Sequence, residues 1–153
     1  MINDQEFLHG AAFLRLINSG ESITILHASE IHPSVYLVEG SGKKSAILFK
    51  VSKKPTSAWS FTLSNTEELT FDKVHYEYPG FSVFLAFVCH KDGICCIALE
   101  RLRTILEKDA VMNGQHISVS RRAHGSYHIS GPGRQRLEQT VPQNDWPRVV
   151  ISK

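Results

Sequence analysis

The sequence contains only three cysteines in 153 residues, and all three lie within one short stretch, at Cys89, Cys95 and Cys96. An odd, clustered set does not make the disulfide framework of a small secreted domain. No run approaches the roughly 18 apolar residues of a membrane-spanning helix. The first ten residues, MINDQEFLHG, have neither the basic nor the apolar region of a signal peptide. These absences predict a protein of the reducing cytoplasm that makes no contact with membranes.

Recognised catalytic signatures are also absent. The chain has no G-x-S-x-G, C-G-x-C-W or H-E-x-x-H pattern. The segment GSGKK at positions 40–44 lacks the spacing of a phosphate-binding loop and precedes a strand, so it is interpreted as a turn. His116, His124 and His128 cluster locally, and we interpret them as solvated surface histidines rather than as a catalytic or metal site.

The cysteines are poorly placed for a metal or a redox pair. Zinc needs four ligands that converge on one point, whereas Cys95 and Cys96 are adjacent and point to opposite faces of a strand. Buried cysteine commonly acts as a small hydrophobic residue. We therefore expect core cysteines, no metal site and no cofactor.

What is present is an ordinary globular composition with an uneven charge distribution. The 42% apolar and 21% charged fractions predict one domain over residues 1–153, with a core in 1–110 and a hairpin and tail in 111–153. Residues 1–40 carry a net charge of −4, residues 41–60 carry +5, and residues 101–153 carry +5. Two basic blocks separated by acidic ones predict a polarised surface if the blocks meet in space.

The stretch from Phe81 to Leu99 is expected to organise the sheet. Its first arm, FSVFLAFVC, is almost wholly apolar, which is typical of a strand covered on both faces. Asp92-Gly93 favours a two-residue hairpin turn, which would place Cys89 opposite Cys96.

The other elements follow from capping residues and hydrophobic periodicity. Helices are expected over 3–18, where the apolar residues leave few positions for solvent, over 64–76, over 100–108 and over 134–141. Strands are expected over 22–28, 34–39, 44–52, 58–63, 115–120, 126–130 and 144–153. The predicted class is α+β: one mainly antiparallel or mixed sheet with helices packed on it, and a C-terminal β-hairpin extension.

This order of elements resembles the restriction-endonuclease-like fold of the PD-(D/E)xK superfamily over roughly residues 4–108. The resemblance implies an acidic residue on one strand and a (D/E)-x-K pattern on the next, which together bind Mg²⁺ for phosphodiester cleavage. Here the pattern is Leu48-Phe49-Lys50, so an apolar residue replaces the second acid. Glu39 would be the first acid and Glu6 a helper. The resemblance therefore implies a degenerate, inactive member.

The basic residues provide the best functional lead, because lysines and arginines on loops suit contact with phosphates. Trp59 alternates with apolar residues and is expected in the core. The predicted contact residues are Lys43, Lys44, Lys50, Lys53, Lys54, Arg121, Arg122, Arg134 and Arg136.

Three functions remain open. The leading hypothesis is a small bacterial-type accessory domain that binds nucleic acid or a nucleoprotein partner without catalysis. The first alternative is a protein-interaction module, such as an immunity, adaptor or subunit protein. The second is a Mg²⁺-dependent nuclease with a migrated acidic residue, which would use Glu39 and Lys50.

Overall fold

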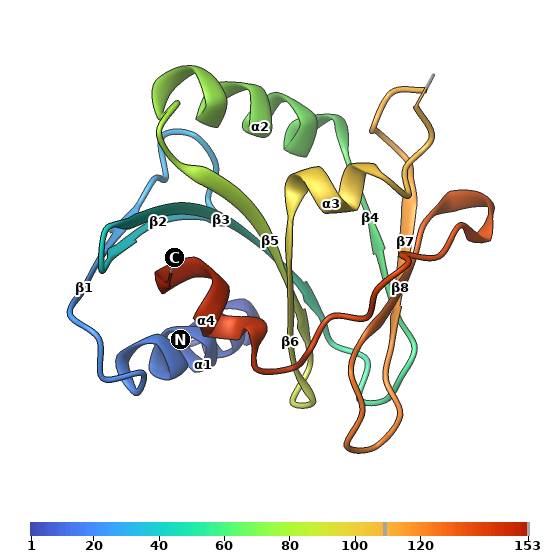
Figure 1. Ribbon diagram of the computed structural model, residues 1–153, viewed down its shortest axis with the longest axis horizontal. Helices are drawn as coiled ribbons and strands as arrows, with labels where there is room; N and C mark the ends of the chain where they lie inside the picture. Colours follow the sequence, from blue (N-terminus) through green and yellow to red (C-terminus); the bar gives the residue numbers. More distant parts are fainter. Residues whose placement is uncertain (109, 153) are drawn as a thin grey trace.

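A computed structural model describes residues 1–108 and 110–152, and it leaves the side chain of Arg134 outside the described set (Figure 1). The helices are α1 (Asp4–Ile17), α2 (Asn65–Glu77), α3 (Leu99–Arg103), α4 (Asp145–Ile151) and a short 3₁₀ turn, η1 (Pro132–Arg134). The strands are β1 (Ile23–His27), β2 (Val35–Gly40), β3 (Lys43–Ser52), β4 (Trp59–Thr62), β5 (Ser82–Cys89), β6 (Gly93–Ala98), β7 (His116–Ser120) and β8 (His128–Ser130).

The strands form two sheets, and the predicted α+β class is confirmed. A five-stranded mixed sheet has the order β1-β2-β3-β5-β6, in which β3 and β5 are parallel and the other neighbours are antiparallel. The parallel pair arises because α2 carries the chain back between them, as a crossover connection must. The predicted C-terminal hairpin is present as β7 and β8, and it pairs with β4 in a three-stranded sheet. Among the described residues, no helix is long and apolar enough to cross a membrane.

Each face of the large sheet has its own hydrophobic core. Helices α1 and α4 cover one face (Figure 1). On this face Leu8, Leu16 and Trp146 pack against strand residues. On the other face, α2, α3 and the small sheet share a larger core in which the ring of Phe61 lies 4.6 Å from that of Phe87. Two covered faces explain why β5 is apolar at nearly every position.

The capping residues act as predicted at both long helices. Asn3 caps α1 by accepting a hydrogen bond from the Glu6 amide at 2.7 Å. Ser64 and Glu67 form a reciprocal capping box at the start of α2. These polar contacts satisfy backbone N–H groups that have no partner within the helix, and they fix where each helix begins.

The hairpin of β5 and β6 has a different register from the predicted one. Cys89 lies opposite Gly93, and the three residues between them form the loop, so Cys96 faces Ala86. The predicted pairing of Cys89 with Cys96 is wrong. Gly93 is required here for close packing, since a Cβ atom would lie 2.6 Å from the hydroxyl oxygen of Tyr127. A tertiary contact therefore overrides the local turn preference.

Helix α1 is less covered than its apolar sequence predicted. Leu8, Ala12 and Leu16 are buried, but Phe7 and Ile17 are 62% and 64% exposed. At 100° per residue these two side chains lie on the side of the helix that faces away from the sheet. The helix thus presents an apolar outer stripe to solvent.

The tail departs most from prediction. The helix expected over 134–141 is replaced by η1 and by isolated bridges that join Arg136 to Ser130 and Val141 to Tyr127. The strand expected over 144–153 is helix α4, which buries Trp146, Val150 and Ile151 against the sheet. Helix α3 is shorter than predicted and ends at Arg103. Lys153, the last residue of the expected strand, lies outside the described residues.

Candidate functional site

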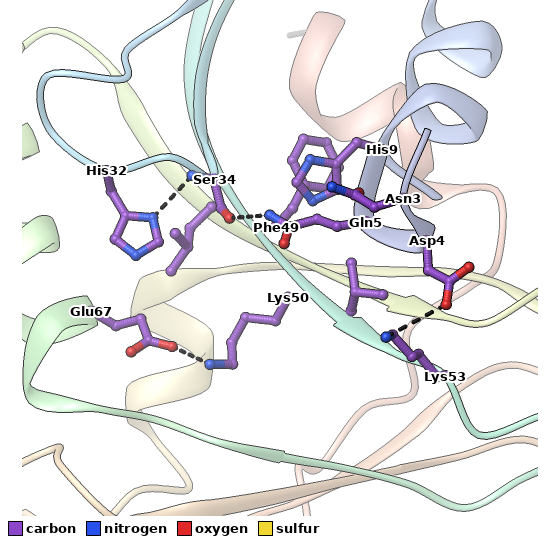
Figure 2. Close-up of a pocket in the computed structure, with 12 residues that line it drawn as sticks. Asn3, Asp4, Gln5, His9, His32, Ser34, Phe49, Lys50, Lys53 and Glu67 are labelled. Atoms are coloured by element: carbon purple, nitrogen blue, oxygen red, sulfur yellow. Dashed lines mark hydrogen bonds and ion pairs between the residues drawn. The ribbon is translucent and has the colours of Figure 1, made fainter. Parts of the chain in front are cut away.

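A cleft of about 410 Å³ opens at one end of the large sheet, between the first turns of α1 and α2 (Figure 2). Gln5 and His9 reach it from α1, Lys50 from β3, Glu67 from α2, and His32 from the loop before β2. Segments far apart in the sequence therefore contribute polar side chains to one hollow, which is typical of a ligand-binding site.

The cleft exists because β3 extends beyond the end of β2. Val35 pairs with Leu48, and the last contact between the two strands is the Phe49 amide donating to the Ser34 carbonyl at 3.0 Å. No strand of the described chain lies beside β3 after that point on this side. Because backbone groups of alternate residues point to the same edge of a strand, the N–H and C=O of Val51 face the cleft.

Lys50 and Glu67 form an ion pair across the cleft floor, with side chains only 18% and 8% exposed. Lys50 comes from the face of β3 that looks toward α2, and Glu67 is the third residue of that helix. One carboxylate oxygen accepts from Lys50, and the other accepts from the Ser64 amide at 3.0 Å. Both oxygens are thus already engaged by the protein.

The two histidines of the cleft lie in different environments. Nδ1 of His32 accepts from the Ser34 amide at 3.0 Å, and burial lowers the pKa of this imidazole despite the nearby Glu67. His9 is 5% exposed and packs against the ring of Phe49, with 4.9 Å between ring centroids. Burial, with a smaller contribution from His27, lowers the pKa of His9. Its Nε2 atom has no hydrogen-bond partner among the described residues.

The buried state of His9 predicts an acid-sensitive fold. Its folded-state pKa lies below the value of 6.5 for an unperturbed histidine, so the unfolded chain binds a proton more readily. The free energy of unfolding should therefore be greatest above about pH 6.5 and fall as the pH drops below that value.

The variant His9→Phe keeps a ring against Phe49 and removes the titrating group. It should raise the free energy of unfolding by about 1 kcal/mol at pH 7, because the unpaired Nε2 is gone. The difference in free energy of unfolding between the variant and wild type, measured by urea titration, should increase as the pH is lowered toward 5. Parallel pH profiles for wild type and variant would contradict this account of His9.

The residues proposed for a divalent metal do not come together. Glu39 is exposed and lies opposite Lys44, at the far end of the strand from Lys50, about 20 Å away along β3. Glu67 is the carboxylate that meets Lys50, but both its oxygens are taken. No group of three or more His, Cys, Asp or Glu side chains in the described part of the chain is placed to hold a metal ion. These donors do not fit a Mg²⁺ site, which requires several free oxygen ligands.

The structure separates the predicted basic residues into several places. Lys43 and Lys44 begin β3, where their ammonium groups lie over the rings of Phe84 and Phe81. Lys50 is in the cleft floor. Arg136 bridges to Ser130, at the opposite end of β8 from the loop that follows β7. Arg134 lies in η1, and its side chain is outside the described set.

One end of the molecule does bring the two basic blocks together. The loops 53–58, 90–92 and 121–127 lie side by side at the lower end of Figure 1. The Arg121 amide donates to the Ser57 hydroxyl at 3.1 Å, and Lys53 and Lys91 line the same small hollow. We call this region the basic loop end, which comprises Lys53, Lys54, Lys91, Arg121 and Arg122.

Within the basic loop end, Arg121 has a structural role. Its guanidinium donates two hydrogen bonds to Asp92, at 2.8 and 2.9 Å, and lies over the ring of Tyr127. The hydrogen bond from Arg121 is the main cause of the lowered pKa of Asp92. This pair ties the 90–92 loop to the loop after β7, while Lys54, Lys91 and Arg122 remain exposed.

The predicted core residues are where they were expected. Cys89, Cys95 and Cys96 are free thiols that are at most 1% exposed, and burial raises the pKa of each one. Trp59 is 1% exposed, and its indole N–H donates to the Lys54 carbonyl at 2.9 Å. Neither the thiols nor this indole are accessible to a ligand.

Sequence reasoning missed several residues of these two regions. Lys91 stands alone between apolar strands, and Glu67 lies in the first turn of a helix, where acidic residues are common, so neither residue carries a local signal of a site. His9, His32 and Gln5 come together only through long-range packing, for which the sequence carries no local signal. Comparisons with protein-family models, with curated proteins and with solved structures find no match for this chain.

Proposed function

We propose that this protein binds nucleic acid through the basic loop end and does not cleave it. The observation that supports this proposal is the meeting of Lys53 and Lys54 with Lys91 and Arg122 on three adjacent loops. These side chains are exposed, and the nearby carboxylates of Asp4 and Asp92 already pair with Lys53 and Arg121.

Five basic side chains against two carboxylates give this end a net positive potential, which attracts phosphates over a Debye length of about 10 Å. The groups sit on loops that are fastened at their bases by hydrogen bonds, so the charges are held together at little additional entropic cost. Loop lysines and arginines of this kind contact phosphate oxygens without reading sequence.

The proposal that the protein does not cleave nucleic acid is supported by the donor set around Lys50, which does not fit a Mg²⁺ site. A degenerate restriction-endonuclease-like core remains our proposal for the ancestry of the fold, since the strand carrying Lys50 and the α2 crossover keep the order expected of that superfamily. Three buried, unpaired thiols suit a reducing compartment, and we propose a cytoplasmic location.

A salt titration tests the proposal. Fluorescence anisotropy of labelled DNA and RNA oligonucleotides should show binding at low salt, with a logarithmic slope of roughly −3 against salt concentration. That slope corresponds to three or four displaced counterions, as the exposed basic groups predict. No affinity for either nucleic acid at low salt would reject this function.

A second candidate function is association through the N-terminal segment. Of the ten large apolar side chains that are exposed in the described chain, seven lie in residues 1–26. Strand β1 is an edge of the large sheet, and it contains no proline and no lysine. Natural proteins usually protect such an edge, and a free apolar edge pairs readily with another strand.

A second copy of this chain is the partner that fits this edge. Antiparallel pairing of two β1 strands centred on Ile25 places Leu26 opposite Thr24 of the other copy, and no like charges face each other. The exposed stripe of α1 ends near β1, since only five residues join Ile17 to Ile23. It would contribute further apolar area.

Leu26→Lys should convert such a dimer to a monomer, because the ammonium would lie in the pairing edge. Light scattering coupled to size-exclusion chromatography would measure the mass. Leu69→Lys is the matched control, since Leu69 is 57% exposed on α2, close to the 55% of Leu26. It should leave the mass unchanged. A wild-type protein that remains monomeric at every soluble concentration would exclude this candidate.

A further inference from the structure

The charges inside the cleft balance one another. Lys50 pairs with Glu67 in the floor, and Lys53 lies 3.5 Å from Asp4 at the rim (Figure 2). A phosphate placed here would have to compete with two carboxylates. The cleft therefore suits a neutral polar group, whereas the uncompensated positive charge lies just outside it, on the basic loop end.

The cleft also presents hydrogen-bonding groups of the kind that can pair with the edge of a nucleobase. Gln5 brings a side-chain amide from α1, and its Nε2 atom donates to the Ser34 hydroxyl at 3.2 Å, which holds the amide in place. Amide side chains pair with base edges because each offers a donor beside an acceptor. The backbone N–H and C=O of Val51 supply a second such pair at the open edge of β3.

The size and walls of the cleft agree with this interpretation. A volume of about 410 Å³ lies near the lower end of the range for small-molecule sites, which is suitable for a single nucleotide. Leu48 and the paired rings of Phe49 and His9 provide apolar and aromatic surface among the polar groups.

His9 gives an independent indication of a binding role. This side chain lines the cleft and is 95% buried, yet its Nε2 atom has no partner among the described residues. A buried polar atom without a partner is costly, and a bound group that supplies the missing partner is one explanation for it.

We propose that the cleft binds one unpaired base of a single-stranded nucleic acid whose phosphates lie on the basic loop end. The two regions adjoin, because Lys53 lines both the cleft and the hollow that contains Lys91. This inference rests on the proposed function and narrows its ligand from nucleic acid in general to a single strand, because a base inside a duplex cannot enter the cleft.

The test compares three probes of equal length, about 25 nucleotides so that the duplex stays paired at low salt: oligothymidylate, its duplex with oligoadenylate, and a chain in which every base is replaced by an abasic site. DNA and RNA forms are measured in parallel. The abasic chain keeps its phosphates, so its affinity reports the loops alone. The single strand should bind roughly 10- to 100-fold more tightly than the abasic chain. The affinity for the single strand should also exceed the affinity for the duplex.

Two variants locate the base. Gln5→Ala should reduce the advantage of the single strand over the abasic chain severalfold and leave binding of the abasic chain unchanged. Gln139→Ala, at an exposed glutamine in the tail, is the matched control. It should change neither the advantage of the single strand nor the binding of the abasic chain. The ring ¹⁵N resonances of His9 and His32 should shift on adding oligothymidylate and not on adding the abasic chain.

The possible outcomes separate the two proposals. Equal affinities for the single strand and the abasic chain, with unmoved histidine resonances, would overturn the cleft inference and leave nucleic-acid binding by the loops intact. Absence of binding to all three probes would remove both proposals.

Discussion

Charge reversal of Lys53, Lys54 and Lys91 is expected to lower the affinity for nucleic acid roughly a hundredfold at low salt. Each exposed ammonium that contacts a phosphate releases about one counterion, so losing three of the four exposed contacts should change the salt slope from roughly −3 to roughly −1. The triple glutamate variant should unfold at the same urea concentration as wild type. Of the three side chains, Lys54 bonds the Ala58 carbonyl and Lys53 lies near Asp4, and both are exposed surface contacts.

Lys43→Glu with Lys44→Glu is the matched control for that prediction. These two lysines begin β3, whereas Lys53 directly follows the last residue of that strand, about 30 Å away. The double variant should retain wild-type affinity to within about twofold and keep the salt slope. If both variants weaken binding to the same degree, net charge alone attracts the nucleic acid, and the basic loop end is not a specific site.

The fold was predictable wherever a local signal and a buried face agreed. The alternation of Trp59 and Phe61 gives strand β4, and the capping residues Asn3 and Ser64 begin α1 and α2. In each case the chemistry of a few neighbouring residues is sufficient, because a strand alternates its faces and a helix start needs acceptors for its free N–H groups.

Prediction failed where distant residues decide the local geometry. The Asp92-Gly93 pair favours a two-residue turn, but Asp92 accepts hydrogen bonds from Arg121 and Tyr127, which lie in the loop between β7 and β8. Those bonds draw the residue into a longer loop and shift the register. In the tail, Val149, Val150 and Ile151 have the propensity of a strand, yet packing on the sheet beside Trp146 selects a helix.

The candidate site was predictable only in part. Charge blocks pointed to Lys53, Lys54 and Arg121, and the structure brings these residues to one end. In the sequence, the pair Lys43 and Lys44 looks equivalent to the pair Lys53 and Lys54, because the first pair begins β3 and the second directly follows it. The two ends of a ten-residue strand lie far apart. No local sequence pattern indicates which end lies beside the loop that contains Arg121 and Arg122.

Lys50→Met is expected to lower the free energy of unfolding by about 3 kcal/mol, since it leaves the Glu67 carboxylate in a largely buried site without its cation. Glu67→Gln should also destabilise, although glutamine still serves the capping box at the start of α2. The double variant should recover to within about 1 kcal/mol of wild type, because a neutral pair carries no unpaired buried charge. Urea titrations of all four proteins give the coupling free energy.

The Lys53–Asp4 pair is the control for this cycle, because its side chains are 74% and 71% exposed. Its coupling should lie within about 0.5 kcal/mol of zero. A large coupling only at Lys50 would identify that lysine as part of the packed structure. The nuclease alternative requires the opposite result: Lys50→Met would stay as stable as wild type but lose Mg²⁺- or Mn²⁺-dependent cleavage of plasmid or RNA. A strand lysine that pairs with a helix-capping glutamate links β3 to α2 across the floor of the cleft.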